Sequence, residues 1–303
     1  MQKSIIDKLV KEFGSAVLFD EPMSCHTSWK VGGPADALLY ATCEEDILRV
    51  LRFTYAEKIP LQVIGNGSNL LVGDGGIRGL VLEISDKFSH CEWSGQSVTV
   101  QAGAMLAAVA KEACEHNLTG LEFAGGIPGT IGGALIMNAG AFGGNIGPLV
   151  TKVELAEYTG KKKVLLAEDL SFAYRNSNLA SFKGVILSVS LALQAGDGSK
   201  SRAALQEHLA YRAAMQPLEY PSCGSVFRNP EGDHAGRLIE ISSLRGKQIG
   251  GAQVSDKHGN FIVNRGGAKA SDIRQLMAEV ADTVEKLHGV RLQPEVRMIG
   301  EFL

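Results

Sequence analysis

The amino-acid sequence predicts an α+β fold with more than one domain. Short apolar runs typical of buried strands alternate with segments whose apolar residues recur at helical spacing. Two glycine-rich stretches, residues 65–69 and 125–133, interrupt this pattern. The first follows a strand-like run, but it lacks the third glycine and the helix that would make it a Rossmann turn. At 303 residues the chain is long enough for about two domains of roughly 100–200 residues each.

The N-terminal part of the chain predicts a helix followed by alternating strands and a second helix. Residues 1–14 carry apolar side chains at helical spacing with charges between them, which favours an amphipathic helix over a signal peptide. Thr42 and Glu45 have the spacing of a capping box for the second helix. The expected elements are a strand at 37–40, a helix at 44–58, and strands at 61–64 and 80–84.

A second unit is expected to begin near residue 89. Its elements are a strand at 97–100, an alanine-rich helix at 105–116, and strands at 153–158, 163–166 and 185–193. Gly160 and the lysines 161–163 mark an exposed hairpin tip, because no aromatic residues are interleaved with these lysines as in a nucleic-acid site.

The polar, glycine-rich run 194–199 is the best candidate for a linker to a third unit. That unit is expected to open with a helix at 200–215 and to include another at 271–288. The predicted segments are therefore 1–88, 89–196 and 197–303.

The two glycine-rich stretches together predict a cradle for phosphate groups. Glycine tolerates positive φ and has no Cβ, so main-chain N–H groups can turn toward an anion and approach it closely. Either stretch alone has the alternative interpretation of a tight turn in a strand-rich domain. As a pair they favour two surfaces that hold one long dinucleotide.

Composition argues against several classes of partner. A formal net charge of -3 and a pI near 6.2 give no general attraction for nucleic acid or an anionic membrane. Five cysteines without a Cys-x-x-Cys pair favour neither a disulfide framework nor a metal site, and they suit a reducing cytosol. Because no run approaches the roughly 20 apolar residues that span a bilayer, we expect no membrane insertion. The oligomeric state is not indicated.

Three further segments complete a pattern of motifs. They are Phe-Ala-Tyr-Arg-Asn-Ser at 172–177, Pro-Ser-Cys-Gly-Ser-Val-Phe-Arg-Asn-Pro at 221–230 and Leu-Gln-Pro-Glu-Val-Arg at 292–297. With the glycine stretches, these motifs resemble the family of UDP-N-acetylenolpyruvoylglucosamine reductases in its shorter form. The resemblance extends from residue 27 to residue 300 and takes in five motifs in the same order.

This resemblance implies a fold, two cofactors and a reaction. The fold would be the two-part FAD-binding fold of vanillyl-alcohol oxidase relatives, followed by a C-terminal α+β substrate-binding domain. The reaction would be the NADPH-dependent reduction of a nucleotide sugar through FAD in the bacterial cytoplasm, for peptidoglycan precursors. FAD is expected to be non-covalent, since residues 117–207 contain no histidine or cysteine to attach it.

The resemblance also implies roles for individual residues. Arg175 and Glu295 would stabilise the negative charge that develops on the substrate carboxylate, and Ser225 would donate a proton to the adjacent carbon. Glu295 would act in its protonated form, although an ordinary ion pair with Arg297 is an alternative from spacing alone. The residues matched to the nucleotide sugar are Tyr211, Arg212, Gln216, Gly224 and Asn229.

The expected FAD contacts are the glycine stretches and the turn-rich run after them. They comprise Gly65, Asn66, Gly67, Ser68, Asn69, Gly125, Gly126, Ile127, Pro128, Gly129, Thr130, Gly132, Gly133, Asn138, Gly140 and Ala141. Cys223 lies beside Ser225, but without a paired histidine nearby in sequence it is interpreted as small packing. His258 has a family-like context and an equally plausible solvated or core role.

Two other functions stay open at this point. A flavin oxidase of the same superfamily would pass electrons to oxygen and produce peroxide. A non-catalytic protein that binds nucleotide sugars would be colourless and would ignore NADPH.

Overall fold

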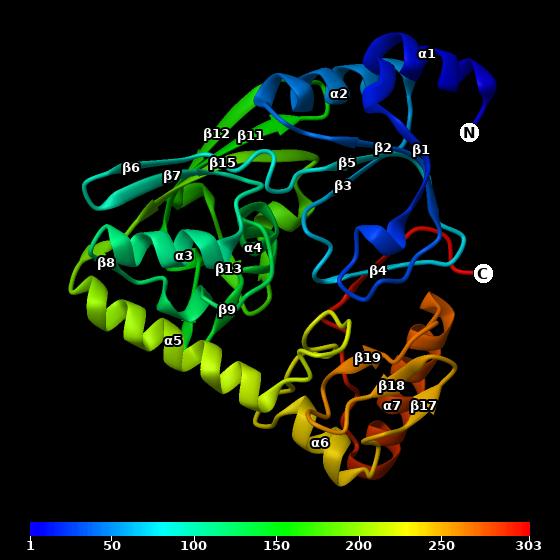
Figure 1. Ribbon diagram of the computed structural model, residues 1–303, viewed down its shortest axis with the longest axis vertical. Helices are drawn as coiled ribbons and strands as arrows, with labels where there is room; N and C mark the ends of the chain where they lie inside the picture. The colour runs from blue at the N-terminus through cyan, green and yellow to red at the C-terminus, as the bar shows by residue number, and fades with distance from the viewer. The chain divides into compact units, whose positions relative to one another are not determined.

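The computed structural model describes all 303 residues, which form two compact units interleaved along the chain. The first unit comprises residues 1–37, 67–79 and 213–303, and the second comprises residues 38–66 and 80–212. Figure 1 follows this course by colour. The predicted boundaries at residues 88 and 196 stay a prediction.

The centre of the second unit is a five-stranded antiparallel sheet in the order β12-β11-β15-β7-β6 (Figure 1). Its strands are β6 (Cys91–Ser94), β7 (Ser97–Gln101), β11 (Val150–Glu157), β12 (Lys162–Leu166) and β15 (Gly184–Ala192). Buried and less buried residues alternate along β7, where Val98 and Val100 are fully buried. One face of the sheet therefore meets the core, as period-2 alternation predicts.

Helices and short strands complete the second unit. The helices are α2 (Glu44–Glu57), α3 (Leu106–Glu115), α4 (Ile131–Met137) and the part of α5 (Gly198–Met215) up to residue 212. The short strands are β3 (Leu61–Ile64), β8 (Leu118–Thr119), β9 (Gly140–Ala141), β10 (Gly144–Asn145), β13 (Phe172–Ala173), β14 (Asn176–Ser177) and β16 (Gln194–Ala195). No helix of the structure has both the length and the apolar character needed to cross a membrane.

The predicted helices and strands of both units occur within a few residues of their expected bounds, but the cap of α2 differs. Asp46, rather than Glu45, accepts hydrogen bonds from the main-chain and hydroxyl groups of Thr42 and from Cys43 N. Cys43 is the residue that precedes the helix, so the residue three positions later is Asp46. The predicted capping box was therefore wrong by one residue.

The run 194–199 is not a free linker. Gln194 and Ala195 form β16, which pairs with β8, and Gly196 N donates to the carbonyl of Asn117. Helix α5 already begins at Gly198, two residues earlier than expected. The polar composition of the run fits its exposed position.

The first unit contains a three-stranded antiparallel sheet and a long helix. The sheet order is β17-β18-β19, and α7 contacts β17 and β18 (Figure 1). The elements of this unit are α1 (Lys3–Phe13), β1 (Leu18–Pro22), β4 (Leu70–Val72), α6 (Ala235–Ile241), β17 (Gln248–Ile249), β18 (Ala252–Val254), β19 (Ile262–Asn264), α7 (Ala270–His288) and β20 (Arg297–Ile299). Two strands, β2 (Pro34–Tyr40) and β5 (Ile77–Glu83), begin in this unit and end in the other.

The core of the first unit joins residues from distant parts of the chain. Trp29 is fully buried there and donates from its indole N–H to the carbonyl of Ile262 at 2.7 Å. Strand β20 pairs in parallel with β4, with Arg297 opposite Leu70. Residues near 30, near 70 and near the C-terminus therefore fix one another in place.

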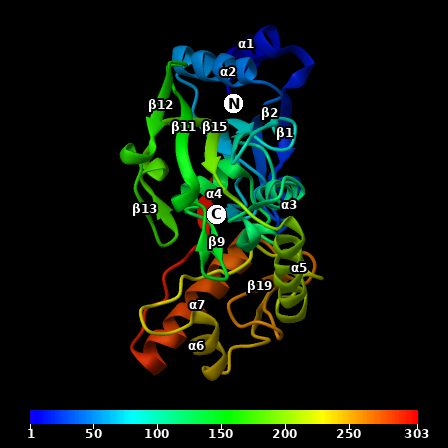
Figure 2. The ribbon, with the colours of Figure 1, turned by 90° about the vertical axis from the view of Figure 1, so that its left-hand side faces the viewer.

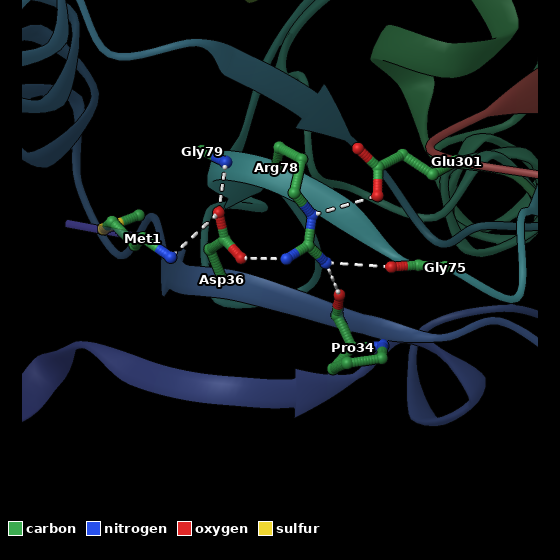
Figure 3. A network of polar contacts seen from close by, with 7 residues as sticks. All are labelled: Met1, Pro34, Asp36, Gly75, Arg78, Gly79 and Glu301. Carbon is green, nitrogen blue, oxygen red and sulfur yellow. Dashed lines mark hydrogen bonds and ion pairs between the residues drawn. The ribbon is translucent and has the colours of Figure 1, made fainter.

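A polar network around Arg78 further ties these segments together (Figure 3). The guanidinium contacts the carboxylates of Asp36 and Glu301 and donates to the carbonyls of Pro34 and Gly75. Asp36 also accepts from Gly79 N at 3.0 Å, and its Oδ2 lies 3.8 Å from the Met1 amino group. Arg78 thus supplies hydrogen bonds to the main-chain carbonyls of Pro34 and Gly75, which the turn at Gly75 would otherwise leave without a donor.

Candidate active site

The start of the first glycine-rich stretch, Gly65 and Asn66, meets the second stretch within the second unit. Asn66 Nδ2 donates to the carbonyl of Pro128 at 2.7 Å. A Cβ on Gly65 would lie only 2.5 Å from the hydroxyl of Thr130, which permits no side chain at position 65. Their proximity is the arrangement that a shared cradle for a dinucleotide requires.

The second stretch offers donors and positive charge in one place. The main-chain N–H groups of Gly126 and Gly129 make no hydrogen bond to another main-chain group. A Cβ on Gly126 would lie 3.1 Å from both Nε and Nη1 of Arg212, so this guanidinium lies over the glycine turn. Burial lowers the pKa of Arg212, as expected for a cation withdrawn from water. This donor set fits a diphosphate group.

Gly125 is glycine for a different reason. A Cβ there would lie 2.5 Å from Cγ of Leu205, so the side chain of α5 already occupies that space. Gly125 and Gly126 therefore let α5 approach the stretch closely. Gly133, at the start of α4, donates to the hydroxyl of Thr130, which caps this helix.

Arg175 lies in the tight turn between β13 and β14 of the second unit. Its backbone has φ +54°, and its Nη1 donates to the carbonyl of Gly140 at 2.8 Å. The turn is fixed by Asn138, whose amide donates to Ala173 O at 3.0 Å and accepts from Gly147 N at 3.0 Å. Asn138 and Gly140, both expected at FAD, thus belong to the support of Arg175.

Ser225 and Glu295 lie together in the first unit. Their segments run antiparallel: Glu295 N donates to Val226 O at 2.8 Å, and Phe227 forms a bridge with Pro294. Both side chains are half-buried. This pairing places the expected proton donor and the expected carboxyl group on neighbouring extended segments.

Two asparagines hold these segments from either side. Asn69 Nδ2 donates to Glu295 O at 3.1 Å, and Asn69 O accepts from Arg297 N at 3.0 Å. The buried Asn260 accepts from Phe227 N and donates to Phe227 O, as a neighbouring strand would. The side chain of Asn69 therefore supports the main chain of Glu295, and its expected contact with FAD stays a prediction.

The residues expected at the nucleotide sugar are divided between the units. Tyr211 and Arg212 belong to the second unit, and Gln216, Gly224 and Asn229 belong to the first. Asn229 accepts from Ala235 N, the first residue of α6, at 3.1 Å. Gly224 has φ +79°, a conformation that favours glycine, so the turn before Ser225 depends on it.

The expected FAD residues are divided in the same way. Gly67, Ser68 and Asn69 belong to the first unit, and the second unit holds Gly65, Asn66, Gly125, Gly126, Ile127, Pro128, Gly129, Thr130, Gly132, Gly133, Asn138, Gly140 and Ala141. Gly132 lies against Ala102, where a Cβ would come within 3.2 Å of the alanine side chain.

The surroundings of Cys223 and His258 are those of packed side chains. Burial raises the pKa of the Cys223 thiol well above its usual value, so the thiol stays protonated at neutral pH. Burial also lowers the pKa of His258, whose ring packs edge-on against Phe261. Both fit a packing role.

Comparison with known proteins identifies the fold. Residues 35–165 match the model of an FAD binding domain, and residues 216–299 match the model of the C-terminal domain of UDP-N-acetylenolpyruvoylglucosamine reductase. The predicted fold class, an FAD-binding fold followed by a C-terminal substrate domain, is confirmed.

The relatives are similar over almost their whole length. UDP-N-acetylenolpyruvoylglucosamine reductase 2 of Symbiobacterium thermophilum is 44% identical over 92% of this chain and 91% of its own. The reductase of Pediococcus pentosaceus is 46% identical over 94% of this chain and 95% of its own. The solved structure of the enzyme from Thermus caldophilus, at 34% identity, gives a TM-score of 0.79 over 93% of this chain and 97% of that one. This chain therefore belongs to the UDP-N-acetylenolpyruvoylglucosamine reductase family.

Proposed function

We infer that the protein reduces the enolpyruvyl ether of UDP-N-acetylglucosamine to UDP-N-acetylmuramate for peptidoglycan precursors, with NADPH as the hydride donor. The observation that carries this proposal is its 43–46% identity, over 94–99% of the chain, to several reductases of this name. When bound, FAD accepts hydride from NADPH and passes it to the double bond of the substrate.

Residues of the second unit would hold the cofactor. The N–H groups of Gly126 and Gly129 suit the diphosphate of FAD, and Asn66 keeps the neighbouring stretch in contact with Pro128. The assignment of the other glycine-stretch residues to FAD is part of the same proposal.

Arg175 would neutralise charge on the substrate. Hydride addition to the terminal methylene carbon places negative charge on the adjacent carbon and its carboxylate. A guanidinium offers fixed positive charge and a planar fork of donors suited to a carboxylate. One of its nitrogens is already directed by the Gly140 carbonyl, which limits the orientations of the fork.

Glu295 would serve as a neutral hydrogen-bond donor to the same carboxylate. An ionised carboxyl group beside a developing dianion would repel it, so the protonated form is the useful one. Its main chain is fixed by Val226 on one side and Asn69 on the other, which leaves only the side chain to adjust.

Ser225 would supply the proton that completes the reaction. A serine hydroxyl is a weak acid, but the carbon next to the carboxylate becomes basic once hydride has added. The segment that carries Ser225 is held by Asn260 through the main chain of Phe227.

The nucleotide sugar, the domain limits and the cellular location complete the proposal. Tyr211, Arg212, Gln216, Gly224 and Asn229 would contact the sugar nucleotide, and residues 197–303 would form the substrate domain. All five cysteines are free thiols, which together with the use of NADPH favours the bacterial cytoplasm.

The direct test is a reaction of the purified holoenzyme with NADPH and the enolpyruvyl sugar nucleotide under anaerobic conditions. We expect a product heavier by two hydrogens and one NADPH consumed per product. In a parallel aerobic reaction, NADPH oxidation that yields peroxide and leaves the sugar nucleotide unchanged would instead identify an oxidase.

A further inference from the structure

The tip of the β9–β10 hairpin carries a strained, exposed aromatic residue. Phe142 has φ +50°, a left-handed conformation that is an outlier for a bulky side chain, and the residue is 44% exposed. Gly143 follows with φ +83°. A glycine at position 142 would adopt this turn without strain, so the backbone does not explain the phenylalanine.

The ring of Phe142 instead makes a specific contact with α5. It stacks on the imidazole of His208 with ring centroids 3.9 Å apart and planes within 4° of parallel. Tyr211, one turn further along the helix, meets the same ring edge-on at 5.7 Å. The hairpin, labelled β9 in Figure 2, is therefore attached to α5 through its tip.

The helix side of this contact is rigid. His208 Nδ1 lies 3.0 Å from the carbonyl of Glu122, and the hydroxyl of Ser201 donates to the carboxylate of Glu122 at 2.6 Å. These two bonds, about two turns apart on α5, fix the helix beside the segment that leads into the second glycine stretch. The imidazole is thus held through its Nδ1 atom, while the face of its ring stacks on Phe142.

The hairpin side leads directly to Arg175. The hairpin has only two residue pairs, Gly144 with Ala141 and Asn145 with Gly140, and so short a hairpin is not stable alone. The carbonyl of Gly140 is the acceptor for Arg175 Nη1. Any tilt of the hairpin would therefore move the acceptor that orients the guanidinium.

We propose that Phe142 and His208 are positioning residues, which hold the β9–β10 hairpin against α5 and thereby orient the guanidinium of Arg175 through the Gly140 carbonyl. This inference rests on the proposed role of Arg175 in charge stabilisation. It explains why a phenylalanine stands in a conformation that glycine would adopt without strain.

The test separates the two half-reactions by stopped-flow absorbance of the flavin. For Phe142→Gly and His208→Ala we expect flavin reduction by NADPH at the wild-type rate. Reoxidation by the enolpyruvyl sugar should slow by on the order of 10- to 100-fold, the scale expected for a misplaced catalytic group. Phe142→Gly relieves the backbone strain, so the melting temperature of this variant should not fall. A variant that only damaged packing would melt at a lower temperature.

Two further variants show whether the stack itself matters. His208→Phe keeps a flat ring in place but loses the imidazole, and it should restore most of the reoxidation rate. His116→Ala breaks a comparable stack with Trp93, at 4.5 Å and 20°, that is separate from the hairpin, and it should leave both half-reactions unchanged.

The outcomes also separate this inference from the proposed role of Arg175. Arg175→Lys with normal reoxidation would remove the arginine from the chemistry. If Arg175→Lys is slow while Phe142→Gly and His208→Ala are normal, the positioning role is wrong. The positioning role is also wrong if Phe142→Gly and His208→Ala lose FAD or slow both half-reactions equally. Phe142→Gly combined with Arg175→Lys should be no slower than Arg175→Lys alone, because both act through one guanidinium.

Discussion

Ser225 has a hydroxyl that the proposed reaction needs only after hydride has reached the substrate. We therefore expect Ser225→Ala to be reduced by NADPH at close to the wild-type rate. Its reoxidation by the enolpyruvyl sugar should be slowed by about 10²–10⁴-fold, the usual contribution of general acid catalysis. Stopped-flow absorbance resolves both steps. Equal slowing of both would make Ser225 a structural residue, and no slowing would assign the proton to another acid.

Glu295 allows a second prediction at the residue scale, because glutamine preserves its size and a donor group. Glu295→Gln should retain more of the reoxidation rate than Glu295→Ala, since the role proposed is donation of a hydrogen bond by a neutral group. Glu295→Asp keeps the carboxyl group on a side chain that is one methylene shorter, so it is the matched control for the length of the side chain. A glutamine variant slower than the alanine variant would contradict the neutral-donor assignment.

Individual residues also show where sequence reasoning reached its limit. Arg175, Ser225 and Glu295 were predicted because short motifs carry them, and the structure brings Ser225 and Glu295 together. Their participation in the reaction stays a proposal. Phe142 and His208 have no motif: their contact joins residues 66 positions apart, and the positive φ of Phe142 cannot be foreseen when phenylalanine rather than glycine occupies the turn.

At the scale of elements, hydrophobic periodicity predicted most helices and strands, since each depends on its own local pattern. Contacts at helix ends were predicted less well. The first residues of α7 are capped by Asp74, whose carboxylate accepts from Ala270 N at 2.8 Å and Ser271 N at 2.9 Å, across 196 and 197 positions. No local spacing contains that information. Strand β16 in the run 194–199 could not be predicted for a related reason, because its partner strand β8 is distant in sequence.

The cap of α2 gives a prediction on stability. Burial alone would raise the pKa of Asp46, but hydrogen bonds from Thr42 and Cys43 lower it below its usual value. Asp46→Ala should lower the free energy of unfolding at pH 7 by about 1 kcal/mol, the typical value of a helix cap. Urea unfolding monitored by circular dichroism measures this difference.

The pH dependence of that loss follows from the direction of the pKa shift. A carboxyl group whose pKa is lowered by folding stabilises the protein above its unfolded pKa, and this contribution disappears as the pH falls through the folded value. The difference between wild type and Asp46→Ala should be full above about pH 5 and shrink toward strongly acidic pH. Glu45→Ala, at the position the sequence favoured, is the control and should have little effect, because its ion pair with Arg52 is exposed.

For the whole molecule, the two meeting glycine stretches predict a yellow protein that binds FAD without a covalent bond. Denaturation should release all of the flavin as intact FAD, measured by absorbance of the filtrate and by its mass. A variant of the cradle, Gly126→Val, should lose FAD affinity, since its side chain would collide with Arg212. Flavin retained on the denatured chain, or a colourless protein that FAD cannot reconstitute, would contradict this prediction.

The parallel pairing of β20 with β4 has a consequence for how the chain folds during synthesis. Residues 38–66 and 80–212 make up one unit, so all of its chain has been made once residue 212 is complete. The other unit needs β20, at residues 297–299, to pair with strand β4 made more than two hundred residues earlier. Contacts so distant in sequence form slowly. The unit formed by residues 38–66 and 80–212 should therefore fold on the ribosome first. Strand β4 should stay unpaired until β20 has been synthesised.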